Sequence, residues 1–150
     1  MNNLNILNPK RLKGGVYNEI RIFDQLSVLE YLKCQLIEIY HEATFEGKLE
    51  SNKLFISGIS SFYKPVIALE VMILGSAYFY QDINTNQLIV KNEIKVRNGK
   101  LNANQIELKG VADIDFLDTA QLIVDGTIYS SGTIRSQTID FKDSSNGKLN

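Results

Sequence analysis

Residues 54–70, LFISGISSFYKPVIALE, and residues 71–87, VMILGSAYFYQDINTNQ, are consecutive segments of 17 residues that share one pattern. Each begins with an apolar residue, a variable residue and a second apolar residue. Each also has a phenylalanine eight positions after its first residue, Phe62 or Phe79. A pattern that repeats at a fixed period of this length predicts a solenoid, in which each repeat forms one circuit and stacks on the last. We call one such circuit a rung.

The same apolar pair recurs along most of the chain, at steps of 17, 17, 17, 17, 18, 16 and 17 residues. The eight pairs are Ile20/Ile22, Ile37/Ile39, Leu54/Ile56, Val71/Ile73, Leu88/Val90, Ile106/Leu108, Leu122/Val124 and Ile139/Phe141. This period predicts about eight rungs of about 17 residues. One extra residue falls at Asn98-Gly99.

Further columns of the repeat are also apolar or small. Counting the first residue of each pair as position 0, position 8 is apolar in every rung except the one containing Ser130, and position 12 is apolar throughout. Positions 6 and 14 are small or apolar in the same rungs. Because side chains alternate across a strand, each rung has three segments that point two residues inward. The stacking also predicts an internal ladder of Phe45, Phe62 and Phe79.

These features predict an all-β fold, a single-stranded right-handed parallel β-helix with a triangular cross-section. Right-handed crossovers dominate between parallel strands. Position 4 holds Asp24, His41, Gly58, Gly75, Asn92, Gly110, Gly126 and Asp143. These residue types tolerate a positive φ, so we expect a left-handed bend after the first segment of each rung. The β-helix domain is expected at residues 16–143, with flexible tails at 1–15 and 144–150.

Composition narrows the possible function classes. The net charge of −1 gives no basis for nucleic-acid binding, and Cys34 is the single cysteine, which fits a reducing compartment. No segment has the length or hydropathy of a signal peptide or a transmembrane helix. The expected location is the cytoplasm, with possible association at the inner face of the membrane.

The chain resembles the bactofilins, a family of bacterial cytoskeletal proteins that form polymers. The resemblance covers roughly residues 14–143 and depends on Gly14-Gly15-Val16-Tyr17 before the first rung and on repeated units such as Phe45-Glu-Gly-Lys-Leu49, Leu54-Phe-Ile-Ser-Gly58 and Val71-Met-Ile-Leu-Gly75. It implies a compact right-handed β-helix that stacks end to end into nucleotide-independent filaments, often at the membrane. Glycine is scarcer in the corner column than the resemblance implies.

The residues themselves also favour polymerisation, because the end rungs of a solenoid expose unpaired strand edges and an open core. Ile20 and Ile22 at one end, and Ile139 and Phe141 at the other, are the expected contact residues. The alternative is that the tails fold over both ends.

Two outward faces could bind partners instead. Phe55, Met72, Leu74 and Ile89 form an expected apolar face for lateral pairing or for a protein partner, such as another cytoskeletal or cell-envelope protein. This favours the alternative function, a β-helix binding module that does not polymerise. Tyr63, Tyr78 and Tyr80 suggest a third hypothesis, a carbohydrate-binding or degenerate enzyme solenoid.

The first 13 residues mix apolar and basic side chains, which could give weak contact with an anionic membrane. These residues are Leu4, Ile6, Leu7, Lys10, Arg11 and Lys13. The alternative is a solvated tail.

The chain contains few of the residue types and motifs that form catalytic sites. His41 is the only histidine and falls in the corner column, and the chain has no phosphate-binding glycine loop and no Cys/His metal spacing. Asp113, Asp115 and Asp118 are expected to be a solvated cluster rather than a calcium site. We therefore expect no enzymatic activity, no cofactor and no metal.

Overall fold

The structure is a computed structural model that describes residues 2–142, and this part of the chain contains strands and no helix. The strands are β1 (Asn2–Ile6), β2 (Lys10–Leu12), β3 (Gly15–Ile22), β4 (Gln25–Val28), β5 (Leu32–Ile39), β6 (Glu42–Phe45), β7 (Leu49–Ile56), β8 (Ile59–Phe62), β9 (Val66–Ile73), β10 (Ser76–Phe79), β11 (Ile83–Val90), β12 (Glu93–Leu108), β13 (Val111–Val124), β14 (Thr127–Tyr129) and β15 (Ile134–Phe141). Every pairing between them is parallel. The predicted parallel β-helix is confirmed.

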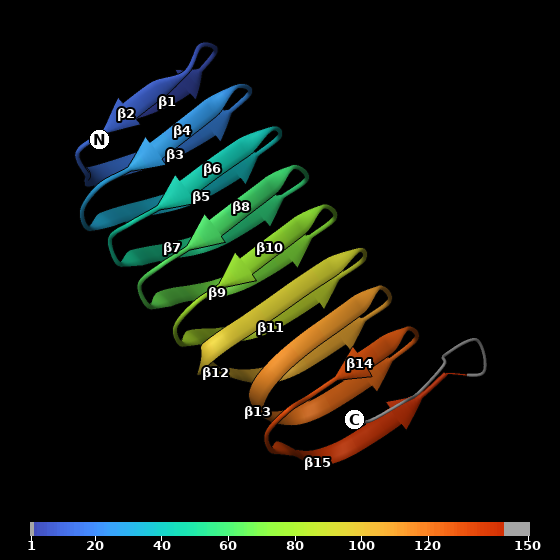
Figure 1. The fold of residues 1–150 in the computed structure, drawn as a ribbon. Helices are drawn as coiled ribbons and strands as arrows, with labels where there is room; N and C mark the ends of the chain where they lie inside the picture. The colour runs from blue at the N-terminus through green and yellow to red at the C-terminus, as the bar shows by residue number, and fades with distance from the viewer. Residues whose placement is uncertain (1, 143–150) are drawn as a thin grey trace.

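Long and short strands alternate along the chain and form opposite walls of the solenoid (Figure 1). In Figure 1 the long strands lie at the back of the molecule and run to the right, whereas the short strands lie at the front and run to the left. The chain moves downward from one rung to the next. This is a right-handed coil. In β12 and β13 one strand passes through both walls of its rung.

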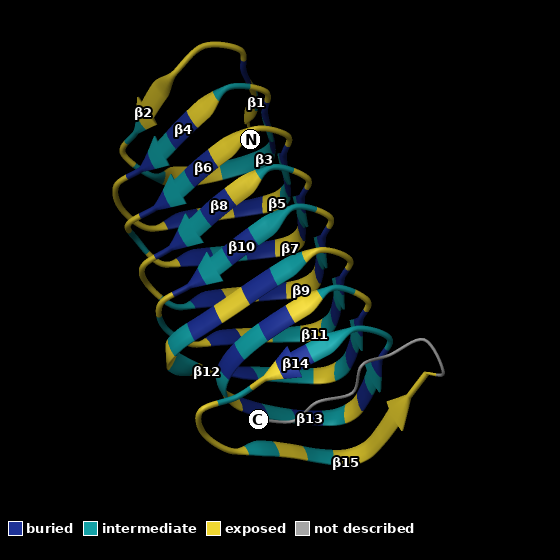
Figure 2. Cartoon of the chain, turned by 45° about the vertical axis from the view of Figure 1, so that its right-hand side comes forward, coloured by how far each residue is buried: buried dark blue, intermediate teal, exposed yellow. Residues whose placement is uncertain are grey.

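The predicted register is confirmed by the pairing of like columns. Leu54 pairs with Ile37 on one side and with Val71 on the other, and the same column continues to Ile139. Phe62 lies between Phe45 and Phe79, with ring centroids 4.9 and 4.6 Å apart and rings nearly parallel. One continuous apolar core therefore runs along the axis, shown as the buried interior in Figure 2.

The three inward segments of a rung are present, but two of them share one strand. In β7, Leu49 and Ser51 are buried, the next two residues point outward, and Leu54 and Ile56 are buried again. Strand pairing skips Asn52 at this point. The corner between the third and first segments is therefore a bend within an eight-residue strand rather than a break between strands.

The N-terminal boundary of the solenoid differs from the prediction. Residues 2–12, which we assigned to a flexible tail, form an additional rung through β1 and β2. Leu4 pairs with Ile20, Ile6 with Ile22, and Leu12 with Val28. The repeat was missed there because Lys10 occupies an inward position and the connection contains Pro9. The expected tail at 144–150 lies outside the described residues.

The expected left-handed corners are wrong. Among the described residues, positive φ angles occur only at Gly14, Gly15 and Asn98, none of them in the corner column. Glycine is favoured in that column by close stacking instead, because a Cβ on Gly75 would lie 2.0 Å from the carbonyl oxygen of Gly58. The extra residue expected at Asn98-Gly99 is confirmed by the positive φ of 59° at Asn98 and by a shift in strand register there.

Candidate functional site

The C-terminal end of the described solenoid has an open strand edge and an exposed core. β15 pairs with β13 along one edge, and no other described strand pairs with it. Ile139 and Phe141 are 42% and 40% exposed, whereas Leu122 and Val124, which precede them in the same columns, are fully buried. Figure 2 shows the change from buried to exposed residues between β13 and β15. The expectation of an apolar contact surface at this end is consistent with these positions.

The N-terminal end carries different residues from those predicted. Ile20 and Ile22 are fully buried beneath Leu4 and Ile6, so they do not form an end surface. Our assignment of them to the end rung is therefore wrong, because it depended on residues 1–15 being a tail.

The actual N-terminal rung is less suited to pairing than the C-terminal one. Ile6 is 2% exposed, and Leu4 and Leu12 are half-buried. Lys10 pairs with Leu26 and so stands in an inward column, which in later rungs holds Ala43, Ser60, Ala77, Ile94, Ala112 and Ile128. Inward-pointing charges and proline at an edge both oppose further strand pairing. The two ends are therefore chemically unequal.

The predicted apolar face is brought together by strand pairing. Phe55, Met72 and Ile89 lie side by side on β7, β9 and β11, and all three are half-buried. They line a shallow groove of about 440 Å³ with Leu36, and the charged residues Glu38, Lys53 and Glu70 also border it. Leu74 is 37% exposed and is not among the residues that line this groove.

Aromatic residues extend this face toward the N-terminus. The rings of Phe23 and Tyr40 stack with their centroids 5.1 Å apart, and the centroid of the Tyr40 ring lies 5.9 Å from that of the Phe55 ring. Sequence reasoning missed this extension, although position 3 of the repeat holds both Phe23 and Tyr40.

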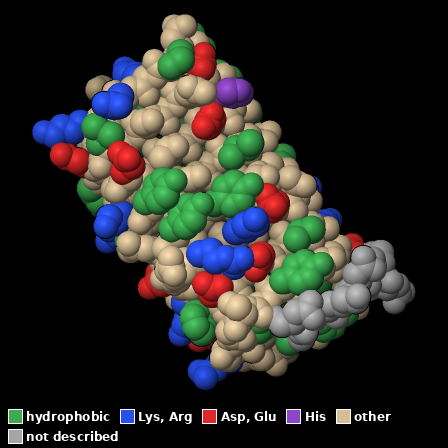
Figure 3. Space-filling view, viewed as in Figure 1, with side chains coloured by type: hydrophobic (Ala, Val, Ile, Leu, Met, Phe, Trp, Pro, Cys, Tyr) green, Lys and Arg blue, Asp and Glu red, His purple; other side chains and the backbone are tan. Residues whose placement is uncertain are grey.

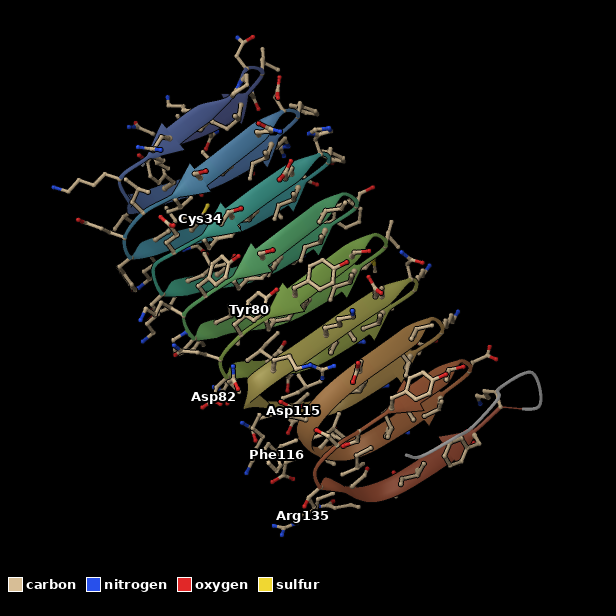
Figure 4. All side chains as sticks on the ribbon, viewed as in Figure 1. Cys34, Tyr80, Asp82, Asp115, Phe116 and Arg135 are labelled. Carbon is tan, nitrogen blue, oxygen red and sulfur yellow. The ribbon has the colours of Figure 1, made fainter. Side chains whose placement is uncertain are left out.

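Of the three tyrosines, Tyr78 lies on β10 in the wall of short strands, and Figure 3 shows hydrophobic side chains gathered near the centre of that face. Tyr63 and Tyr80 stack on each other with centroids 4.9 Å apart, and Tyr80 is labelled in Figure 4. The Tyr78 hydroxyl donates a hydrogen bond of 2.7 Å to Glu93. That hydrogen bond is the main cause of the raised pKa of Tyr78, and burial of the hydroxyl is the second cause. Because these groups already contact one another or a carboxylate, they leave less free ring surface for a saccharide.

The expected acidic cluster is divided by an arginine. Arg97 binds both carboxylate oxygens of Asp113 and also lies 3.2 Å from Asp115. Burial opposes ionisation of Asp115, but hydrogen bonds from Ser131 and from the Asn98 backbone, together with Arg97, hold its pKa below the usual value. Within residues 2–142, no group of three or more acidic, histidine or cysteine side chains is placed to hold a metal ion.

Two apolar residues of the expected membrane segment pack against the core. Ile6 is buried and Leu4 is half-buried where they pack on the second rung, so Ile6 is not exposed for the expected membrane contact and Leu4 is exposed only in part. Leu7 remains 65% exposed, and Lys10, Arg11 and Lys13 are also exposed. No described residue belongs to a helix that could cross a membrane.

Cys34 is the only buried nucleophile that the sequence singled out. Its side chain is 2% exposed, its thiol contacts the Leu36 carbonyl oxygen at 3.1 Å, and burial raises its pKa to about 11. His41 lies exposed at a corner. A thiol that stays protonated at neutral pH is a poor nucleophile.

No family model, curated protein or solved structure matches this chain.

Proposed function

We propose that this protein is a structural scaffold whose β-helices stack end to end into filaments without nucleotide. The observation that carries the proposal is the C-terminal rung, where an eight-residue strand has one unpaired edge among the described residues and where Ile139 and Phe141 are about 40% exposed. The resemblance to bactofilins supports the same reading. The protein would then act in the cytoplasm, with itself as the first partner.

Stacking another copy on this end continues two interactions that already stabilise every internal rung. Each added rung pairs backbone groups along the strand edge and buries the inward apolar side chains beneath it. Burying a large apolar side chain contributes about 1.5–3 kcal/mol. Because Ile139 and Phe141 are only about 40% exposed, covering the rest of both side chains provides about 1–2 kcal/mol in total, to which the backbone pairing adds and from which the entropy cost of association is subtracted.

A filament also requires the N-terminal end to pair. Leu4 and Leu12 supply apolar surface there, and β1 and β2 each have one open edge within residues 2–142. The inward Lys10 opposes this contact. We therefore expect the C-terminal contact to form first and the N-terminal contact to limit filament length.

The test is negative-stain microscopy with sedimentation of the purified chain, without nucleotide, beside a Phe141→Arg variant. Leu69→Arg is the matched control, because Leu69 is 58% exposed on β9 in the middle of the solenoid. We expect filaments from the wild type and from Leu69→Arg, and their loss in Phe141→Arg with unchanged circular dichroism. A wild type that remains monomeric at high concentration would refute the proposal.

A second function, a non-polymerising binding module, is favoured by the groove beside Phe55, Met72 and Ile89. Its bordering residues Lys53 and Glu70 are exposed and lie 3.9 Å from each other as a long ion pair, and Glu38 in the same groove is paired with Arg21. This suits a mixed-charge protein segment with apolar side chains. The discriminating variant is Met72→Glu, which should leave self-assembly intact and abolish capture of such a partner.

A further inference from the structure

A shallow polar groove crosses the first half of the long strands near the C-terminal end of the described solenoid. Its volume is about 460 Å³, and it extends over four successive long strands, β11, β12, β13 and β15. Two outward columns of the repeat border it, one that begins at Asn84 and one that contains Asn104 and Gln137. Small side chains lie between these two columns, so a ligand can approach the backbone of each rung. We call this hollow the amide groove.

The side-chain amides of the amide groove are only partly used within the protein. Asn102 donates a hydrogen bond of 3.1 Å to the side-chain oxygen of Asn84, and Asn104 donates one to Asn86. A side-chain amide has two N–H donors and an oxygen with two lone pairs. Among the described residues, Asn84 and Asn102 make no further side-chain hydrogen bond, and Gln137 makes none. The amide groove therefore presents both donors and acceptors to a ligand.

The floor of the amide groove adds hydroxyl groups and leaves space above them. Thr85, Thr119 and Ser136 each donate a hydrogen bond to a backbone carbonyl oxygen two residues further along their own strand. Their hydroxyl oxygens keep lone pairs that can accept a hydrogen bond. Ala103 and Ala120 contribute no bulky side chain to the lining. A lining of amides, hydroxyls and small side chains suits a ligand that is rich in hydroxyl groups.

The charges that line the amide groove cancel. Asp118 and Arg135 are its two ionisable lining residues, and their charges are opposite. They are neighbours in the strand register, and neither forms an ion pair with another described residue. A groove without net charge has no electrostatic preference for a phosphate backbone or another charged polymer.

We propose that the amide groove binds a neutral, extended polysaccharide, with one sugar residue on each rung. Neighbouring rungs are about 4.8 Å apart, and a straight, β-linked sugar chain advances by a similar distance for each residue. Sugar hydroxyls both donate and accept hydrogen bonds, which matches the amides of the groove. Four rungs accommodate about four sugar residues. This binding is independent of the self-assembly proposed above.

An extended peptide fits the amide groove less well than a sugar chain does. A β-strand advances about 3.3 Å per residue, so successive peptide residues do not fall on successive rungs. The amide groove also lies on the outer face of strands that are already paired, not at a strand edge. A peptide therefore cannot bind there as an additional strand.

Both ends of the amide groove are marked by a change of side chain. Toward the N-terminus, Ile67 pairs with Asn84 and occupies the same outward column, so the polar lining stops there. Toward the C-terminus, Asp118 and Arg135 also line a smaller hollow of about 200 Å³ beside Phe116. Phe116 is 45% exposed, and Figure 4 shows it on the same side of the molecule as Arg135. Its ring offers an apolar surface to the face of a sugar at this end.

The first test is isothermal titration calorimetry of the full chain with cellobiose and with cellohexaose. Cellohexaose should bind at least about tenfold more tightly, because it occupies more rungs. Asn102→Ala removes an amide from the middle of the groove and should weaken cellohexaose binding about fivefold to tenfold. Asn52→Ala is the matched control, because Asn52 donates a similar amide hydrogen bond to Gln35 outside the amide groove.

A second variant distinguishes loss of binding from loss of folding. Ala120→Tyr fills the amide groove and removes no side-chain hydrogen bond, so it should abolish cellohexaose binding. Its circular dichroism spectrum and urea midpoint should stay close to those of the wild type. Leu69→Tyr is its control, because Leu69 is exposed in the same outward column but does not line the amide groove.

The outcomes decide both the ligand and the site. Cellohexaose binding that both groove variants weaken and both controls retain supports the proposal. Equal affinity for cellobiose and cellohexaose would overturn the extended ligand, and unchanged binding in Asn102→Ala and Ala120→Tyr would overturn the site. Binding of polygalacturonic acid in place of cellohexaose would overturn the neutral ligand. Absence of binding to all three saccharides at millimolar concentration would overturn the proposal as a whole, and each of these results leaves the filament proposal standing.

Discussion

Replacing Phe62 with alanine should destabilise the solenoid more than any substitution on its surface. The side chain is fully buried, and its ring stacks on Phe45 at 4.9 Å and on Phe79 at 4.6 Å. Removing a buried phenylalanine side chain costs about 3–5 kcal/mol, including the cavity left behind. Two aromatic contacts of about 0.5–1.5 kcal/mol each are lost as part of that sum. We therefore expect the free energy of unfolding to fall by about 4 kcal/mol.

The assay is urea denaturation followed by far-UV circular dichroism, at a concentration where the chain is monomeric. Low concentration matters because assembly adds its own stabilisation to the folded state. Hydrogen exchange resolved by peptide should place the loss in β6, β8 and β10, because a solenoid rung is stabilised mainly by its neighbours.

Phe116→Ala is the matched control, because Phe116 is 45% exposed and its replacement should cost well under 1 kcal/mol. A Phe62→Leu variant keeps most of the apolar volume and loses both stacking contacts, so its cost should be intermediate. If Phe62→Ala cost no more than Phe116→Ala, the internal ladder would not contribute as we describe.

Four further predictions concern the N-terminal rung, the thiol and the acidic network. Lys10→Leu should lengthen assemblies, seen as faster sedimentation, because it removes the inward charge from the N-terminal rung; shorter assemblies would contradict this role. Deleting residues 1–13 should lower the free energy of unfolding by about 3 kcal/mol or more in urea melts, because Ile20 and Ile22 lose their apolar cover; unchanged stability would show that the first rung does not contribute. Cys34 should react with a thiol reagent only slowly at pH 8 and faster toward its pKa of about 11, and ready labelling at neutral pH would argue against its burial. Asp115 has a lowered pKa in the folded state, so the stabilisation it provides is present at neutral pH and is lost as the pH falls below about 4. The Asp115→Asn variant should therefore lose less free energy of unfolding than the wild type between about pH 5 and pH 2. Equal losses in the two proteins would contradict the proposed network.

The sequence by itself determined the central fold of this protein. A period of 17 residues together with alternating apolar positions was enough to establish the register of the internal rungs and the ladder of Phe45, Phe62 and Phe79. This succeeded because each rung meets the same neighbours above and below, so the chemistry of one column repeats along the chain. The apolar face of Phe55, Met72 and Ile89 followed from the same register.

Only the tertiary structure decided the ends and the corners. The first rung was hidden because Lys10 and Pro9 break the apolar pattern, and an end rung has a partner on one side alone, so its sequence is less constrained. The corner column was misinterpreted because glycine is favoured at two kinds of position, those with a positive φ and those where two backbones approach closely. The sequence pattern alone does not distinguish these two kinds of position. The same limit applies to Arg97, whose contacts with Asp113 and Asp115 cross from one rung to the next. Local periodicity determines what repeats, whereas ends, corners and charged contacts depend on which atoms meet in space.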